Sequence, residues 1–244
     1  KNILKKKINF FIPNELTKWR VETFFNKEPE TIEWINSFKN SKATIFWDIG
    51  ANIGLFSIYN SLKNKKSCTI SFEPSTSNLK VLSRNISINN LKNINIFPIA
   101  LSDKKNGFFM MNENKFVDGG ALNTFSERYN FEGKTFKPEM NYNFYGTNIE
   151  KLINDKFLEI PSYIKIDVDG IEHLILKGMG KYLKNKKIKS ILVEINENFQ
   201  FQFRTIISLM LKNNFILLHK KNNENFFKYN SNHKNTFNYI FIRK

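Results

Sequence analysis

The amino-acid sequence predicts an α/β fold, in which a mostly parallel sheet carries helices on both faces. Three observations support this. Short apolar runs alternate with helical segments from Thr44 onward, the connections between them are short, and 244 residues suffice for one sizeable domain. Seven strands are expected, with the last two joined as a hairpin.

The elements follow one another in a regular order. Pro29 opens a predicted helix over 29–39, in which Ile32, Trp34, Ile35 and Phe38 recur at helical spacing. Seven apolar runs are read as strands, and most of the segments between them as helices. The predicted strands are 44–50, 67–74, 94–103, 163–170, 189–196, 215–220 and 237–244, and the later helices are 51–63, 75–90, 147–155, 171–184 and 201–214.

Residues 104–146 interrupt this alternation. The segment contains five glycines and only short strand-like pieces, and an irregular segment of this length is usually functional or mobile. We therefore expect a helical N-terminal preface over 1–40 and a main domain over 41–244 that contains the insertion 104–146.

Composition restricts the function classes. The chain carries a formal charge of +16, but its lysines are scattered and arginines are few, unlike the clustered basic face of a nucleic-acid-binding module. Cys68 is the single cysteine, which excludes a disulfide within the chain and indicates a reducing, cytoplasmic compartment. No apolar run approaches the length of a membrane span.

The stretch DIGANIG, residues 48–54, follows the first apolar run. Its glycines expose backbone N–H groups at a helix N-terminus, which suits an anion. The spacing Asp48-x-Gly50-x-x-x-Gly54 differs from the G-x-G-x-x-G of dinucleotide sites, and a carboxylate would repel pyrophosphate. This argues against a nicotinamide-dependent oxidoreductase. The pattern instead fits S-adenosylmethionine, which carries an ammonium and a sulfonium besides its carboxylate.

Glu73 ends the second predicted strand, 23 residues after Gly50. An acid at this position can accept hydrogen bonds from both ribose hydroxyls of an adenosine. The glycine turn and this acid, in register with a β-α-β unit, together predict an S-adenosylmethionine site.

Several motifs resemble those of the FkbM-type S-adenosylmethionine-dependent methyltransferases. They are DIGANIG, FEPSTSNLKVLSRNISINNL, ALSDKKNG and KIDVDGIEHLILKG, and the resemblance covers roughly residues 20–200. It implies a class I methyltransferase (Rossmann-like) fold, with strand order 3-2-1-4-5-7-6 and the last strand in sequence antiparallel. It also implies O-methylation, often of sugar hydroxyls, with the insertion 104–146 on the substrate side.

The same resemblance assigns cofactor-binding residues. It places the methionine end of the cofactor at Asp48, Gly50, Asn52 and Gly54, the ribose at Glu73, and the adenine near Ser102 and Asp103. A plain turn is the alternative for Ser102 and Asp103.

Acidic residues gather after the fourth and fifth predicted strands, whose tips are neighbours in this topology. Asp167, Asp169 and Glu172 follow the fourth strand and Glu194 ends the fifth. Converging carboxylates raise one another's pKa unless something compensates for their charge. Two alternatives remain open: a carboxylate acts as general base toward a substrate hydroxyl, or Asp167 and Glu194 hold a divalent cation such as Mg²⁺.

The predicted catalytic residues are Asp167, Asp169, Glu172 and His173. Helix capping is the alternative for Asp169 and Glu172, and a structural role is the alternative for His173. The predicted acceptor is a small molecule, a sugar hydroxyl of a nucleotide-linked sugar or glycan precursor. A nucleic-acid methyltransferase is the alternative, but the Asn/Asp-Pro-Pro-aromatic tip of many amino-methylating enzymes is replaced by IDVDG, which favours oxygen. The sequence does not distinguish a monomer from a homodimer.

Overall fold

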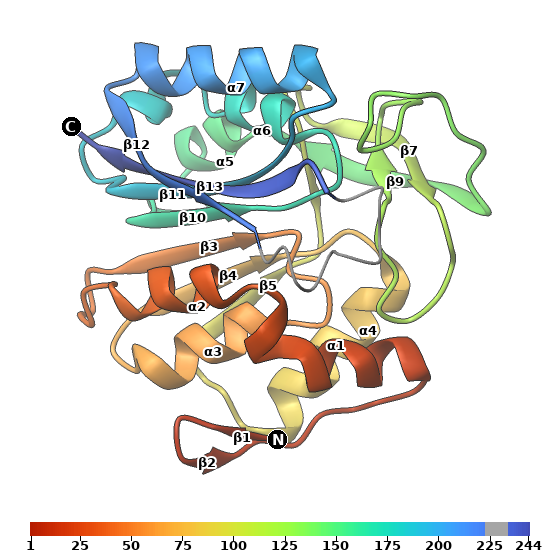
Figure 1. Ribbon diagram of the computed structural model, residues 1–244, viewed down its shortest axis with the longest axis vertical. Helices are drawn as coiled ribbons and strands as arrows, with labels where there is room; N and C mark the ends of the chain where they lie inside the picture. Colours follow the sequence, from red (N-terminus) through yellow and green to blue (C-terminus); the bar gives the residue numbers. More distant parts are fainter. Residues whose placement is uncertain (223–233) are drawn as a thin grey trace.

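The computed structural model describes residues 1–222 and 234–244. At its centre is a seven-stranded sheet with the order β12-β13-β11-β10-β3-β4-β5. The pairs within β11-β10-β3-β4-β5 are parallel, and β13 runs antiparallel to both of its neighbours. Figure 1 shows α1–α4 on one face of this sheet and α5–α7 on the other. The sheet is thus mostly parallel, with helices on both faces, as predicted.

The strands of the main sheet are β3 (Ile45–Ile49), β4 (Cys68–Phe72), β5 (Ile94–Phe97), β10 (Tyr163–Ile166), β11 (Ser190–Asn196), β12 (Phe215–Lys221) and β13 (Thr236–Arg243). The helices are α1 (Glu15–Lys27), α2 (Pro29–Asn36), α3 (Leu55–Lys63), α4 (Thr76–Ile88), α5 (Ile149–Asn154), α6 (Glu172–Gly178), the 3₁₀ helix η1 (Gly180–Lys184) and α7 (Gln200–Lys212). Connection 223–233 between β12 and β13 lies outside the described residues.

Successive strand residues point to opposite faces of a sheet, and this alternation builds two cores. In β3, Trp47 and Ile49 pack with α5–α7, whereas Phe46 packs with α1–α3. Asp48 and Lys165 lie on the same face as Phe46, nearer the carboxyl end of the sheet. Both are charged yet almost fully buried. The face under α1 and α2 is therefore apolar near one end and charged near the other.

The N-terminal region contains more structure than the sequence predicted. A short hairpin, β1 (Asn2–Ile3) and β2 (Lys6–Lys7), precedes α1, which the prediction did not locate. Asn14 and Thr17 form a capping box at the start of α1. Glu15 in its first turn and Lys27 in its last are the favourable signs for the helix dipole.

The predicted third strand, 94–103, is in fact divided. Pro98 follows β5 and cannot donate to a sheet ladder. The chain then leaves the main sheet, and β6 (Ala100–Leu101) joins a second sheet with β7 (Gly107–Glu113), β8 (Thr124–Phe125) and β9 (Met140–Thr147), in the order β6-β9-β7-β8. The insertion supplies β7, β8 and nearly all of β9, and this sheet lies beside the carboxyl ends of the main strands (Figure 1).

Two predicted helices have different limits. The helix predicted from residue 51 begins at Leu55, since residues 50–54 form the glycine turn. The helix predicted over 171–184 is divided into α6 and η1. Gly180, the first residue of η1, has a positive φ of 51°. Within the described residues, no helix is both long and apolar enough to cross a membrane.

Candidate functional site

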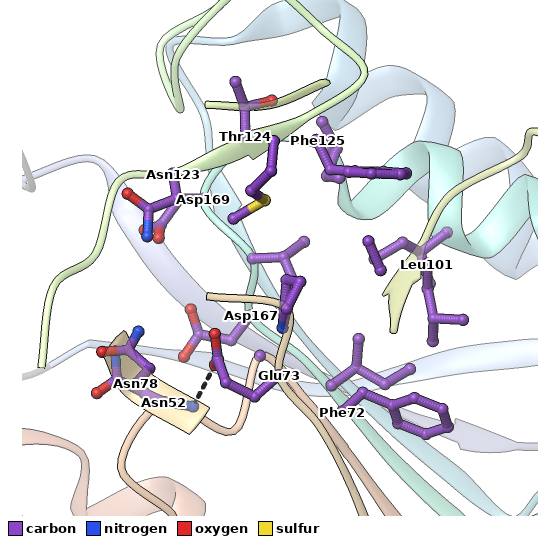
Figure 2. Close-up of a pocket in the computed structure, with 18 of the residues that line it drawn as sticks. Asn52, Phe72, Glu73, Asn78, Leu101, Asn123, Thr124, Phe125, Asp167 and Asp169 are labelled. Atoms are coloured by element: carbon purple, nitrogen blue, oxygen red, sulfur yellow. Dashed lines mark hydrogen bonds between the residues drawn. The ribbon is translucent and has the colours of Figure 1, made fainter. Parts of the chain in front are cut away.

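A cavity lies at the carboxyl ends of β3, β4 and β10, under the second sheet. It spans about 570 Å³ of space, part of which is open to solvent. Figure 2 shows apolar side chains on one side of it and polar side chains on the other. The apolar side includes Phe72, Leu101 and Phe125, and the polar side includes Asn52, Asn78, Asp167 and Asp169, with Glu73 between them. This combination suits a ligand with an aromatic ring and charged groups.

Gly50 allows β3 and β10 to approach each other at the cavity floor. Its φ is +81°, and a Cβ added there would lie 1.9 Å from the carbonyl oxygen of Asp167. Gly54 also has a positive φ, +89°, but an added Cβ there would meet the Leu82 side chain at 2.5 Å, away from the cavity. The two glycines of the motif therefore have different roles. Gly50 shapes the cavity, and Gly54 allows α3 to pack closely against α4.

We expect Gly50→Ala to be the more harmful of two matched substitutions. The new methyl group would collide with backbone that cannot move freely, and the positive φ adds strain, so a loss of about 2–4 kcal/mol in unfolding free energy is expected. Gly54→Ala meets only the end of a flexible leucine and should cost less. Urea denaturation of both variants measures the difference, and an equal loss would contradict this account of Gly50.

Glu73 follows β4 and lies at the centre of the cavity wall. Its carboxylate accepts hydrogen bonds from the backbone N–H groups of Asn52 at 2.7 Å and Ser75 at 2.9 Å. Burial raises the pKa of Glu73 to about 7, against those hydrogen bonds. Asn52 has a positive φ of 50°, a conformation that costs energy in a non-glycine residue and is found often at functional sites.

Asp48 is enclosed in the sheet and lines neither cavity described here. Its Oδ2 accepts a hydrogen bond from the Ser57 hydroxyl at 2.6 Å, while Oδ1 is buried without a partner among the described residues. Burial raises the pKa of Asp48, which Lys165 opposes. Asp48 thus lies behind the walls of both cavities, and its role at the methionine end of the cofactor stays a prediction.

Ser102 and Asp103 also lie off the cavity wall. The Ser102 hydroxyl accepts a hydrogen bond from the backbone N–H of Lys104 at 3.0 Å, which is the geometry of a turn. The residues that reach the cavity are the preceding Ile99, Ala100 and Leu101. Because the chain leaves the main sheet at Pro98, these apolar residues line the cavity in place of Ser102 and Asp103.

Three carboxylates converge beside the cavity. Asp167, Asp169 and Glu194 each have an oxygen within 4.8 Å of the others, and these residues include the pair predicted to face each other across the cleft. The Lys165 ammonium, itself only 1% exposed, contacts Asp167 Oδ2 at 2.6 Å. The sequence analysis overlooked Lys165, although a lysine inside the apolar run YIKI was the signal for it.

The three carboxylates differ in their affinity for a proton. Lys165, helped by a hydrogen bond from Glu194, holds the pKa of Asp167 below its usual value despite burial. Burial and the neighbouring Asp167 raise the pKa of Glu194 well above its usual value. Burial and Asp167 also raise the pKa of Asp169, to about 6.

Asp169 does not cap the following helix. Its Oδ2 accepts a hydrogen bond from the backbone N–H of Leu122 at 2.7 Å, and its φ is +62°. Asp169 thereby holds segment 118–123 of the insertion across the strand tips. The same segment is clamped by Asn52 and Asn78, which both donate to the Gly120 carbonyl oxygen.

Glu172 braces the loop after β10. Its carboxylate accepts hydrogen bonds from the backbone N–H groups of Val168 and Gly170 and from the Gln202 side-chain amide. It is 2% exposed and does not line the cavity. The structure thus places this predicted catalytic residue in a supporting position behind Asp167 and Asp169.

Removing the Glu172 carboxyl group should destabilise the protein. Glu172→Ala leaves buried N–H donors unpaired, at a cost of about 1–3 kcal/mol each. Burial raises the pKa of Glu172 from 4.5 to about 8, so the folded state retains this proton over that range and the unfolded state does not. The wild-type unfolding free energy should therefore fall as pH rises through this range. Glu172→Gln should show a flatter dependence in urea titrations, and identical pH profiles would contradict this.

His173 packs against the start of α7. It is 1% exposed, its ring packs edge-on against Phe199 and Phe201, and burial lowers its pKa to about 4. His173 lines no described cavity. The structure therefore does not bring it to the carboxylate cluster, because its position on α6 turns it toward α7.

A second cavity, of about 490 Å³, adjoins the first on the α1 side of the glycine turn. The two cavities share Gly50, Asn52 and Asp167. The second is lined by the glycine turn and by the charged side chains Arg20, Lys27, Glu28, Lys165 and Asp167. Sequence analysis missed the contributions from α1, because nothing local in the sequence shows which face of the sheet that helix covers.

Solved structures similar to this chain include several that are described as methyltransferases. A structure from Clostridium thermocellum, provisionally described as an rRNA methylase, has a TM-score of 0.51 at 9% identity and covers 89% of this chain and 95% of its own. Precorrin-6y C5,15-methyltransferase from Geobacter metallireducens has a TM-score of 0.48 at 12% identity, with coverages of 89% and 88%. TrmK of M. capricolum, solved with S-adenosylhomocysteine, has a TM-score of 0.47 at 14% identity, with coverages of 87% and 67%.

The fold and the position of the cavity at the carboxyl ends of the strands are those of a class I methyltransferase domain. No curated protein matches the chain. The family model described as methyltransferase FkbM domain matches residues 48–217, and the chain belongs to this family. Because the chain belongs to a methyltransferase family, a nicotinamide-dependent oxidoreductase is no longer an alternative for its function.

Proposed function

We propose that the protein is an S-adenosylmethionine-dependent O-methyltransferase that acts on a sugar hydroxyl, in a nucleotide-linked sugar or a glycan precursor. The observation that carries the proposal is the carboxylate cluster of Asp167, Asp169 and Glu194 next to the glycine turn. A hydroxyl needs a proton acceptor to become a nucleophile, and this cluster supplies one.

The cavity residues fit S-adenosylmethionine. Glu73 can accept from the ribose hydroxyls, Phe72, Ile99 and Leu101 offer apolar surface to the adenine, and Gly50 leaves the floor open. The site also contains more carboxylates than cationic groups, which favours a ligand that carries positive charge. When bound, the cofactor would supply an electrophilic methyl group on a sulfonium.

Asp169 is the proposed general base. It lines the cavity, and its pKa of about 6 leaves it largely ionised yet basic at neutral pH. Asp167 and Lys165 form an ion pair beside it, and Glu194 completes the cluster. The proton of the acceptor hydroxyl would thus pass to Asp169, while Asp167 keeps its charge.

The same carboxylates fit a hard divalent cation, the second alternative. Mg²⁺ prefers carboxylate oxygens, and Asp167, Asp169 and Glu194 each offer one. A cation there would acidify the acceptor hydroxyl. Lys165 already compensates for part of the negative charge, which favours the metal-free alternative.

A hydroxyl acceptor agrees with the loop after β10. The sequence IDVDG places acids there, and no Pro-Pro tip is present to grip a planar amino group. These features favour a small sugar over RNA, and we propose that the insertion sheet forms part of the acceptor pocket.

The test is an acceptor screen with methyl-labelled S-adenosylmethionine. Nucleotide-linked sugars, free glycans, tRNA and rRNA fragments are incubated in parallel, and the label is followed. We expect transfer to a sugar hydroxyl. Selective labelling of RNA, with no turnover on any glycan precursor, would contradict the proposed acceptor and leave the methyltransferase assignment in place.

A further inference from the structure

We propose that the second cavity holds the methionine portion of the cofactor, and that Arg20 of α1 binds its carboxylate. This rests on the proposed function and adds a specificity residue to it. The sequence placed the amino-acid end of the cofactor at the glycine motif. In this proposal an N-terminal helix, outside the matched family region 48–217, also recognises it.

The two cavities together have the shape that the cofactor requires. The first contains Glu73 and the apolar surface proposed for adenosine. The second continues from it around Gly50 and Asn52 and is bordered by Ala51, Ile53 and Leu55 of the glycine turn. A ligand that places its ribose at Glu73 and its sulfonium near Asp167 would extend its remaining chain into this second space.

Arg20 is the cation in this cavity that has no carboxylate partner. Lys27 contacts Glu28 at 2.9 Å, and Lys165 contacts Asp167 at 2.6 Å. Arg20, by contrast, donates from Nε to the Gly119 carbonyl oxygen at 2.6 Å, and no ion pair joins it to another residue within 1–222 and 234–244. Its Nε bond fixes the guanidinium plane and leaves the terminal nitrogens for a planar anion.

The cavity also offers acceptors for an ammonium. Glu28 and Asp167 line it. Lys165 contacts Asp167 Oδ2, while Glu28 is bonded through Oε1 to Lys27 and accepts at Oε2 from Thr31 and Asn238, each at 3.4 Å. A ligand that carries a carboxylate and an ammonium on the same carbon matches this pairing of an unpartnered guanidinium with carboxylates.

Two ligands that differ by one carboxylate test the inference. Calorimetric titration of wild type and Arg20→Gln with S-adenosylmethionine and with decarboxylated S-adenosylmethionine gives four dissociation constants. We expect Arg20→Gln to weaken S-adenosylmethionine binding about 10- to 100-fold, the range for a charge-assisted hydrogen-bonded pair, and to leave the decarboxylated ligand within about twofold. Arg20→Lys, which keeps the charge without the fork, should lie between them.

Controls separate this role from a structural one. Asn14→Ala removes another contact between the start of α1 and the insertion, the bond from Asn14 Nδ2 to the Asp118 carbonyl oxygen, and should affect both ligands equally. Equal weakening of both ligands by Arg20→Gln, or unchanged binding of both with a loss of turnover, would overturn the inference. Wild-type protein that binds neither ligand would overturn the proposed function itself.

Discussion

Asp169→Asn is expected to lower turnover by about 10²- to 10⁴-fold, the range for loss of a general base. The substituted amide keeps an oxygen for the hydrogen bond from Leu122, so segment 118–123 should stay in place. It cannot accept a proton from the hydroxyl. In steady-state assays the loss should appear in kcat, with the dissociation constant of S-adenosylmethionine within a few-fold of wild type.

The same assay distinguishes the two alternatives for the carboxylate cluster. Wild-type turnover is measured after exhaustive EDTA treatment, with and without added Mg²⁺ or Mn²⁺. The metal-free account predicts undiminished activity in chelator, and activity restored only by a divalent cation would contradict it. Asp167→Asn should also be severely impaired, because it leaves the buried Lys165 without its partner. The exposed helix substitution Ser83→Ala serves as the control.

Glu73→Gln is expected to weaken S-adenosylmethionine binding by about 10- to 100-fold. The ionised carboxylate can accept from both ribose hydroxyls, whereas an amide offers only one acceptor oxygen, and hydrogen bonds to a charged group contribute about 1.5–3 kcal/mol. The pKa of Glu73 in the free protein is about 7. Wild-type affinity should therefore fall as pH drops below about 7, because the ligand prefers the ionised form.

The pH dependence provides an internal check on Glu73. In Glu73→Gln the decline in affinity below neutral pH should be lost, since the substituted residue does not titrate. Retention of the wild-type pH profile would assign the titration to another group. Tight binding by Glu73→Gln across the whole range would contradict the placement of the ribose.

The sequence predicted the main sheet well because local patterns determine it. Apolar runs such as TIFWDIG and SCTISFEP mark strands that are buried on both faces, and the glycine turn marks the switch from strand to helix. The same reasoning located Glu73, Asp167 and Asp169 correctly at the strand ends, since parallel strands bring those ends to one edge.

Some predicted site residues do not line the cavity, because tertiary contacts direct their side chains elsewhere. Asp48 has the same local pattern whether it faces a ligand or the sheet interior, and the side chains above β3 decide between them. Glu172 and His173 adjoin the cluster in sequence, yet the start of α6 directs them to Gln202 and Phe199. Arg20 reaches the site only because α1 packs over the carboxyl edge of the sheet, a contact that sequence spacing does not reveal.

The most direct test of the central claim is calorimetric titration of the wild-type protein with S-adenosylmethionine at pH 8, beside NAD⁺ as a control ligand. The account predicts saturable binding with one site per chain, strongly weakened in Glu73→Gln, and no binding of NAD⁺. A folded protein that fails to bind S-adenosylmethionine, or that binds it equally well without the Glu73 carboxylate, would contradict the account.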